Sequence, residues 1–121
     1  MSIQNWGPVR DCMQKNVVEV DGRLDVLQAL KVMKRENTTS LIVKRRDEHD
    51  EYGLVLFSDI AKKVMAQNRA PERVNVDEIL DKPVLLGRPD MEIRYCARMF
   101  VNFVISHAPV AENGNIIGMV S

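Results

Sequence analysis

The feature that most constrains the fold of this chain is an internal repeat. Sliding the sequence by 67 residues aligns the apolar pattern of its two halves over about 45 positions per copy. Aligned pairs are Val9 with Val76, Asp11 with Glu78, Met13 with Leu80, Lys15 with Lys82 and Val43 with Val110. Gly53 matches Gly118 at a shift of 65, because the first copy carries a longer charged loop. Self-similarity of this kind indicates one supersecondary unit that occurs twice.

The first part of each copy predicts a strand followed by a helix. Val17–Val20 is rich in β-branched residues and ends at the turn pair Asp21-Gly22. Val26, Ala29, Leu30 and Met33 recur with the spacing of one face of a helix, which ends at Asn37.

The second part predicts two strands and a second helix. Residues 39–43 form one strand, and the run 54–57 after Gly53 forms the other. The charged stretch 44–51 between them is predicted to be an exposed hairpin loop. Asp59 is interpreted as the N-cap of a helix over about residues 59–68.

The repeat sets the expected domain boundaries. Residues 1–8 form an N-terminal approach segment, 9–68 the first repeat, 69–75 a connector and 76–121 the second repeat. The second repeat is predicted to be truncated, without its final helix, because Ser121 stands where the last strand would lead into it. The predicted fold class is α/β (α+β), with two pseudo-symmetric repeats, each ordered strand-helix-strand-strand-helix.

Composition excludes several classes of function. The 17 basic and 17 acidic residues balance, whereas a general nucleic-acid binder needs a basic excess, so no nucleic acid is expected as a partner. Two cysteines without metal-type spacing, no secretory signal and no long apolar run predict a cytoplasmic protein that does not engage a membrane.

Catalytic and metal-binding patterns are missing from the sequence. It has no Gly-rich phosphate loop before a lysine, no nucleophile elbow and no Cys-His-Asp set that the chain order brings together. The acidic loop 47–51 does not have the ligand spacing of an EF-hand. We therefore predict a protein that is not an enzyme and holds no metal.

Taken together, the order and duplication of these segments resemble a tandem pair of CBS domains, also called a Bateman module. In copy one the resemblance rests on residues 9–13, 24–33, 37–43 and 53–60, and in copy two on 76–80, 93–100, 104–110 and 118–121. It implies a regulatory module that binds AMP, ADP or ATP, or S-adenosylmethionine, in clefts between the repeats, needs no other cofactor and forms a homodimer.

The resemblance also implies the ligand contacts. The family phrase is a glycine, two apolar residues, Thr or Ser, two variable residues and Asp. Copy one matches it at Gly53 and Asp59 but has Leu56 at the hydroxyl position, and copy two keeps the hydroxyl as Ser121. Asp59 is then a ribose ligand as well as a cap, because a carboxylate can accept hydrogen bonds from both ribose hydroxyls.

Two ligand sets follow from the resemblance. The first combines Asp59 with Lys82, Pro83, Val84, Ile105, Ser106 and His107. The second combines Asn16, Val17, Thr39 and Ser40 with Ser121. Two alternatives stay open beside nucleotide binding: an S-adenosylmethionine sensor, and a structural or protein-interaction dimer whose clefts are empty.

Overall fold

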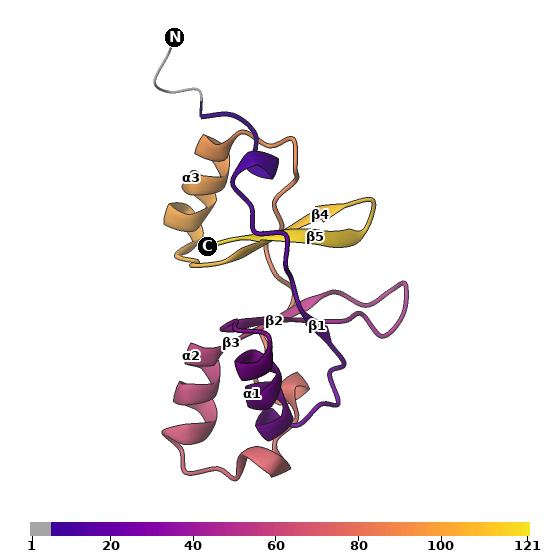
Figure 1. Cartoon of the computed structure of the whole chain (residues 1–121), viewed down its shortest axis with the longest axis vertical. Helices are drawn as coiled ribbons and strands as arrows, with labels where there is room; N and C mark the ends of the chain where they lie inside the picture. The colour runs from indigo at the N-terminus through magenta and orange to yellow at the C-terminus, as the bar shows by residue number, and fades with distance from the viewer. Residues whose placement is uncertain (1–5) are drawn as a thin grey trace. The chain divides into compact units, whose positions relative to one another are not determined.

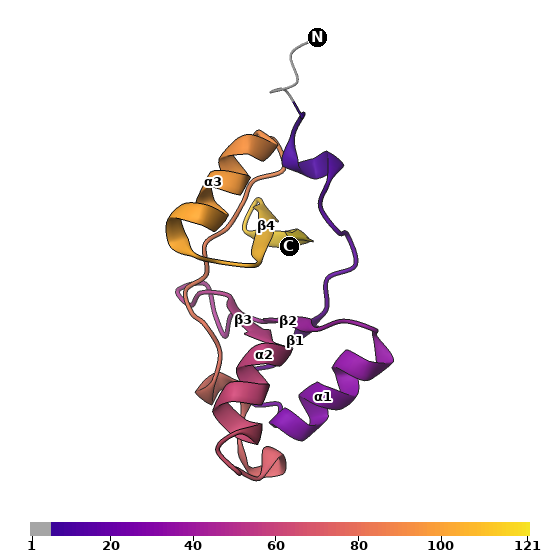
Figure 2. The same cartoon turned by 90° about the vertical axis from the view of Figure 1, so that its left-hand side faces the viewer.

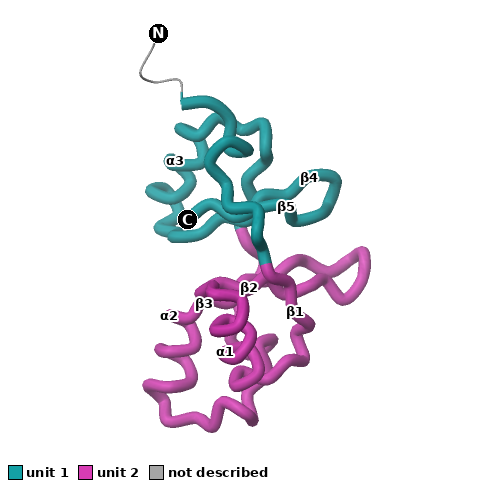
Figure 3. Tube along the Cα trace, in the orientation of Figure 1, with its two compact units in different colours: residues 1–17, 85–121 teal, residues 18–84 magenta. Residues whose placement is uncertain are grey.

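Two compact units make up the protein, as seen in a computed structural model that describes residues 6–121 (Figures 1 and 3). Residues 18–84 form one unit, and residues up to 17 together with 85–121 form the other. The start of the predicted approach segment, residues 1–5, lies outside the described residues.

A three-stranded sheet is the centre of unit 18–84. Its strands β1 (Glu19–Val20), β2 (Ser40–Val43) and β3 (Gly53–Leu56) lie in the order β1-β2-β3. Strand β1 runs parallel to β2, and β3 runs antiparallel to it. Because β2 is the central strand, its residues Leu41, Ile42 and Val43 are almost fully buried.

Helices α1 (Val26–Arg35) and α2 (Phe57–Ile60) cover the same face of this sheet (Figure 2). Asp25 caps α1 by accepting a hydrogen bond from the Gln28 backbone at 2.8 Å, and the Gln28 side chain accepts one from the Asp25 backbone at 3.3 Å. The predicted end of this helix is confirmed, since Asn37 adopts a left-handed conformation with φ 52°. The shared core consists of Val20, Val26, Ala29, Met33, Leu41, Val43, Val55, Ile60, Val64, Val74, Val76 and Ile79.

The predicted start of the second helix is wrong by two residues. Helix α2 begins at Phe57, its N-cap is Leu56, and Asp59 is the third helical residue. The helix continues as a π-helical turn over Ala61–Met65. The helix begins before Asp59 because the Asp59 carboxylate accepts a hydrogen bond from the Leu56 N–H at 3.0 Å, which is the contact of a third helical residue with its N-cap.

The other unit packs one helix against one hairpin. Helix α3 (Ile93–Phe103) lies against strands β4 (Ala108–Glu112) and β5 (Asn115–Val120). Val9, Cys96 and Val110 form its buried core. The repeat predicts a strand at residues 84–87, which match Val17–Val20, and it is reduced to one parallel bridge between Gly87 and Val110, because a glycine has no side chain to pack and weakens a strand.

The repeat at 67 residues is confirmed in detail by hydrogen bonds that recur in both units. Val9 N–H donates to the Met91 carbonyl at 2.7 Å, and its counterpart Val76 donates to Leu24 at 2.9 Å. Each of these donors lies in a short 3-10 turn, Val9–Asp11 or Val76–Glu78. Each turn therefore closes the unit that contains the helix and hairpin of the other repeat.

The matched glycines mark where these closing segments cross a strand. A Cβ on Gly53 would lie 3.0 Å from Leu80, and one on Gly118 would lie 2.6 Å from the Met13 sulfur. Leu80 and Met13 are themselves repeat partners. The glycine of the family phrase thus serves close backbone approach in both units.

Candidate functional site

Asp59 lies at the junction between β3 and α2. Its Oδ2 accepts a hydrogen bond from the Leu56 backbone N–H at 3.0 Å, and its side chain is half-buried. This bond satisfies one of the free N–H groups at the helix start and fixes the carboxylate in place. Oδ1 has no partner in the described part of the chain, so it is available to a ligand hydroxyl.

Thr39 and Ser40 lie at the same end of the sheet as Asp59. Ser40 pairs with Leu56 in the β2–β3 ladder, and the Thr39 carbonyl accepts from Phe57 N–H at 2.8 Å. Thr39 is exposed and Ser40 is half-buried. The sequence placed these residues in separate ligand sets, whereas the structure gathers them at one sheet end.

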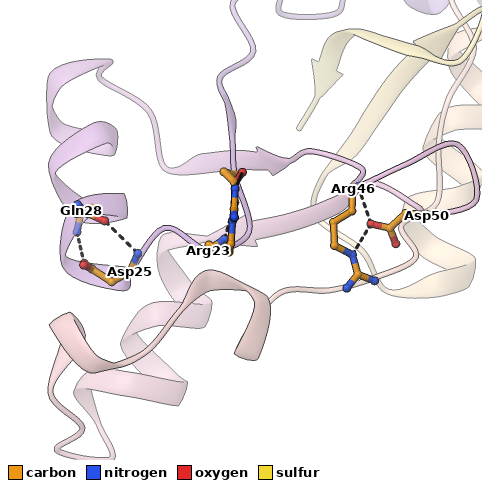
Figure 4. Close-up of polar contacts among 6 residues, drawn as sticks. Arg23, Asp25, Gln28, Arg46 and Asp50 are labelled. Carbon is orange, nitrogen blue, oxygen red and sulfur yellow. Dashed lines mark hydrogen bonds and ion pairs between the residues drawn. The ribbon is translucent and has the colours of Figure 1, made fainter.

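Lys82 lies beside the beginning of β3, where Asp81 pairs with Leu54. Its Nζ is 2.7 Å from Asp50 Oδ1, and Asp50 also accepts bonds from the Arg46 backbone and side chain at 2.9 and 3.1 Å (Figure 4). The two cations hold the pKa of the Asp50 carboxyl well below its usual range. Because Asp59 follows the end of β3, Lys82 and Asp59 are at opposite ends of this strand.

The remaining residues near Lys82 offer little polar chemistry. Pro83 is exposed and Val84 is half-buried. The Asp50–Lys82 pair was missed from the sequence, where Asp50 was read only as part of an exposed acidic loop. The signal was a carboxylate three residues before an apolar strand, which is too common to single out.

The other unit gathers a second polar set at one end of its hairpin. The Ser106 hydroxyl and His107 Nδ1 are 2.8 Å apart. Ala108 pairs with Val120, so His107 precedes and Ser121 follows the same ladder position. Ile105 is half-buried and its N–H bonds to the Phe100 carbonyl at 3.1 Å.

Both predicted ligand sets draw residues from the two units. Asp59 belongs to unit 18–84 and Ile105, Ser106 and His107 to the other, while Asn16 and Val17 directly precede the boundary at residue 18. The assembly of either complete set therefore stays a prediction.

Two further features of the described residues concern metals and membranes. Between residues 6 and 121, no group of three or more His, Cys, Asp or Glu side chains is arranged to hold a metal ion. Within the same span, no helix has the length and apolar character needed to cross a membrane.

The fold is that of a protein with two tandem α/β repeats, each closed by a short turn of the other. Comparison with known proteins identifies the family. The CBS domain model matches residues 9–66 and again 76–121. This chain belongs to the CBS domain family and contains a pair of CBS domains.

Solved structures agree with this assignment. A hexameric CBS-CP12 protein from bloom-forming cyanobacteria is 36% identical, with a TM-score of 0.90 over 94% of this chain and 66% of that one. A CBS domain pair solved in complex with 5′-methylthioadenosine and S-adenosyl-L-methionine is 25% identical, with a TM-score of 0.79 over 94% of this chain and 88% of that one.

Curated relatives are longer proteins. A homoserine O-acetyltransferase of Methanosalsum zhilinae is 35% identical over 93% of this chain, and an uncharacterised protein of Methanopyrus kandleri is 27% identical over 72% of it. The chain spans 22% of the first relative's length and 45% of the second's.

Proposed function

We propose that this chain is a non-catalytic regulatory module that binds an adenine nucleotide through the β3–α2 junction. The observation that carries the proposal is the half-buried Asp59 carboxylate, whose Oδ2 is held by Leu56 N–H at 3.0 Å while Oδ1 is available. A carboxylate oxygen held in place suits a ribose hydroxyl, and Thr39 and Ser40 lie at the same sheet end.

Regulation would follow from differential affinity. A ligand shifts the balance between two arrangements of the protein only by binding one of them more tightly. The module is proposed to act as a homodimer, in which ligand binding favours one arrangement and a larger protein or a partner responds to it. A cytoplasmic location belongs to this proposal.

S-adenosylmethionine is the second candidate ligand. It is supported by the relative that was solved with S-adenosyl-L-methionine and 5′-methylthioadenosine. The third candidate is an interaction module without a ligand. Leu56 supports it, because this position lacks the hydroxyl that would otherwise donate to ribose or phosphate.

Isothermal titration calorimetry of the chain with AMP, ATP and S-adenosylmethionine distinguishes these candidates. We expect micromolar binding of one adenine ligand and a loss of about 10- to 150-fold in Asp59→Asn, because a hydrogen bond to a charged group contributes about 1.5–3 kcal/mol. Asparagine keeps an oxygen for Leu56 N–H and removes the charge.

Glu72→Gln is the matched control, since Glu72 is an exposed carboxylate in the same unit. Its affinity should equal that of the unchanged chain. No heat with any of the three compounds would contradict the sensor function and favour the interaction module. Equal binding by Asp59→Asn would contradict binding through the β3–α2 junction.

A further inference from the structure

A cavity of about 380 Å³ opens at the opposite end of the three-stranded sheet from Asp59. Its lining comes mainly from the residues that follow β1 and β2, and it comprises Asp21, Gly22, Arg23, Lys44, Arg45, Arg46 and Asp77. Because β1 and β2 are parallel, their carboxyl ends meet at this edge. Asp59 follows the antiparallel β3 and is therefore at the other edge.

The wall of this cavity is fixed by backbone hydrogen bonds. Asp77 N–H donates to the Gly22 carbonyl at 3.1 Å, and Val76 N–H donates to Leu24 at 2.9 Å. A Cβ on Gly22 would overlap the Asp77 carboxylate, so the glycine lets Asp77 approach the chain after β1. The closing segment of the second repeat thus completes the cavity.

The charges that line the cavity are predominantly positive, with four cationic side chains and two carboxylates. Asp21 is engaged by Arg23, with Arg23 Nε 3.1 Å and NH2 3.2 Å from its two oxygens. This pairing lowers the pKa of Asp21 to about 2, so the carboxylate is ionised at neutral pH.

Lys44 and Arg45 carry the excess charge. Arg46 is bonded to Asp50 at 3.1 Å and is held in place by it. Arg45 stacks over the Tyr52 ring, with Cζ 5.0 Å from the ring centroid, which leaves its charge at the surface. The Lys44 backbone N–H donates to the Val20 carbonyl at 2.9 Å, whereas its ammonium group makes no hydrogen bond or ion pair among the described residues.

A second hollow of about 400 Å³ lies on the other side of Lys44 and Arg45 and is lined by Glu19, Asp47 and Glu48 as well. Its carboxylates make that side unfavourable for an anion. An anion drawn to Lys44 and Arg45 is therefore directed to the cavity that Arg23 and Arg46 also line.

We propose that the 380 Å³ cavity binds a small ligand that carries a diphosphate group. Guanidinium groups match phosphate oxygens with paired hydrogen bonds, and lysine adds a point charge. Two uncompensated cations suit two phosphate groups, and the volume, within the range of about 300–1,000 Å³ that small-molecule sites occupy, exceeds the need of one phosphate ion. Asp77 accepts a hydrogen bond from a hydroxyl on the same ligand.

Inorganic pyrophosphate is the probe for this site. In ¹H–¹⁵N correlation spectra of the whole chain, we expect shifts at residues 21–23, 44–46 and 77, with Thr39, Ser40 and Asp59 unmoved. Lys44→Gln and Arg45→Gln should each weaken binding about 10- to 150-fold, since a charged hydrogen bond contributes roughly 1.5–3 kcal/mol. The difference in pyrophosphate affinity between each variant and the unchanged chain should also shrink as salt is added, because salt screens the charge that the variant removes.

Lys62→Gln is the control, because Lys62 is an exposed cation of the same unit beyond the other end of the sheet. Its pyrophosphate affinity should be unchanged, as should that of Asp59→Asn, which separates this site from the proposed nucleotide site. No binding at millimolar pyrophosphate, shifts centred on Asp59, or equal losses in Lys44→Gln and Lys62→Gln would each overturn the proposal.

Discussion

At the scale of single residues, Asp50 shows how one carboxylate orders a charged loop. Its side chain is 9% exposed, although the neighbouring residues 44–49 are all exposed. Asp50 contacts both Arg46, near the start of the loop, and Lys82, which lies 32 positions after Asp50 in the chain. The loop between β2 and β3 is therefore anchored to the segment that closes the unit.

Asp50→Asn should lower the urea midpoint of unfolding at about pH 7 and change its pH dependence. The pKa of Asp50 is depressed in the folded state, so its stabilisation is fully present above the unfolded value of about 3.9 and is lost as pH falls through the folded value. The difference between the two proteins should shrink from about pH 5 downward.

Asp90→Asn is the comparison variant, because Asp90 makes an exposed pair with Arg88 at 3.8 Å. Exposed pairs of this kind contribute little. A midpoint difference for Asp50→Asn that stays constant down to pH 2, or one no larger than that of Asp90→Asn, would contradict the anchoring role.

Asp59 illustrates what residue patterns can predict about the site. The sequence predicted that its carboxylate lies at the strand–helix junction, and it does. It could not predict which helix position Asp59 occupies, since carboxylates are common both at the N-cap and at the third helical position, although the first accepts from N–H groups inside the helix and the second from the N-cap N–H. It also could not predict the Asp50–Lys82 pair, which depends on a contact between distant segments.

At the scale of elements, the ends of the two repeat-matched helices differ in one informative way. Asn37 and Val104 occupy equivalent positions after α1 and α3, and both have φ 52°. Asparagine tolerates this left-handed conformation, whereas a β-branched valine is strained in it. Val104 is also 90% exposed, so packing does not offset the strain.

Val104→Asn should therefore stabilise the protein by about 1 kcal/mol, and Asn37→Val should destabilise it by a similar amount. The free energy of unfolding from urea titrations measures both. Loss of packing cannot account for either change, because both side chains are exposed. Equal stability in the Val104 variant would show that the turn is not strained.

Elements whose apolar residues recur with a regular spacing were predicted well, whereas elements that depend on tertiary contacts were predicted less completely. The apolar stripe of Val26, Ala29 and Met33 predicted α1, and all three side chains are buried. The segment of the second copy that matches Val17–Val20, residues 84–87, keeps one parallel bridge, Gly87 with Val110, at the position equivalent to Val20 with Val43. The repeat therefore predicted where the pairing occurs but not that it would shrink to a single bridge.

At the scale of the whole molecule, sequence boundaries and compact units do not coincide. Residues 6–17 pack with 85–121, and residues 76–84 pack with the first repeat's sheet. The duplication itself was visible in the sequence as a shift of 67 residues. The sequence did not reveal that each closing turn packs in the unit of the other repeat, because alignment of the two copies does not show which copy a turn contacts.

Fragments that follow the repeats should therefore fail to fold alone. Residues 1–68 lack the turn Val76–Glu78, and residues 76–121 lack the turn Val9–Asp11. We expect neither fragment to show a cooperative urea transition by circular dichroism, and a mixture of the two to regain one.

Residues 18–84 are the control, because they contain one complete unit and should unfold cooperatively. A cooperative transition in isolated 1–68, as steep as that of 18–84, would show that the closing turn is dispensable.

The exchanged turns also bear on how such a chain can arise. In a protein with a single copy of the repeat, no closing segment would cover the strand that begins at the matched glycine. Only a second molecule could supply that closing turn. A single-copy ancestor would have been a swapped homodimer, with each molecule completing the other. Joining two such molecules in one chain would turn an assembly that depends on concentration into one that depends on the length of a connector.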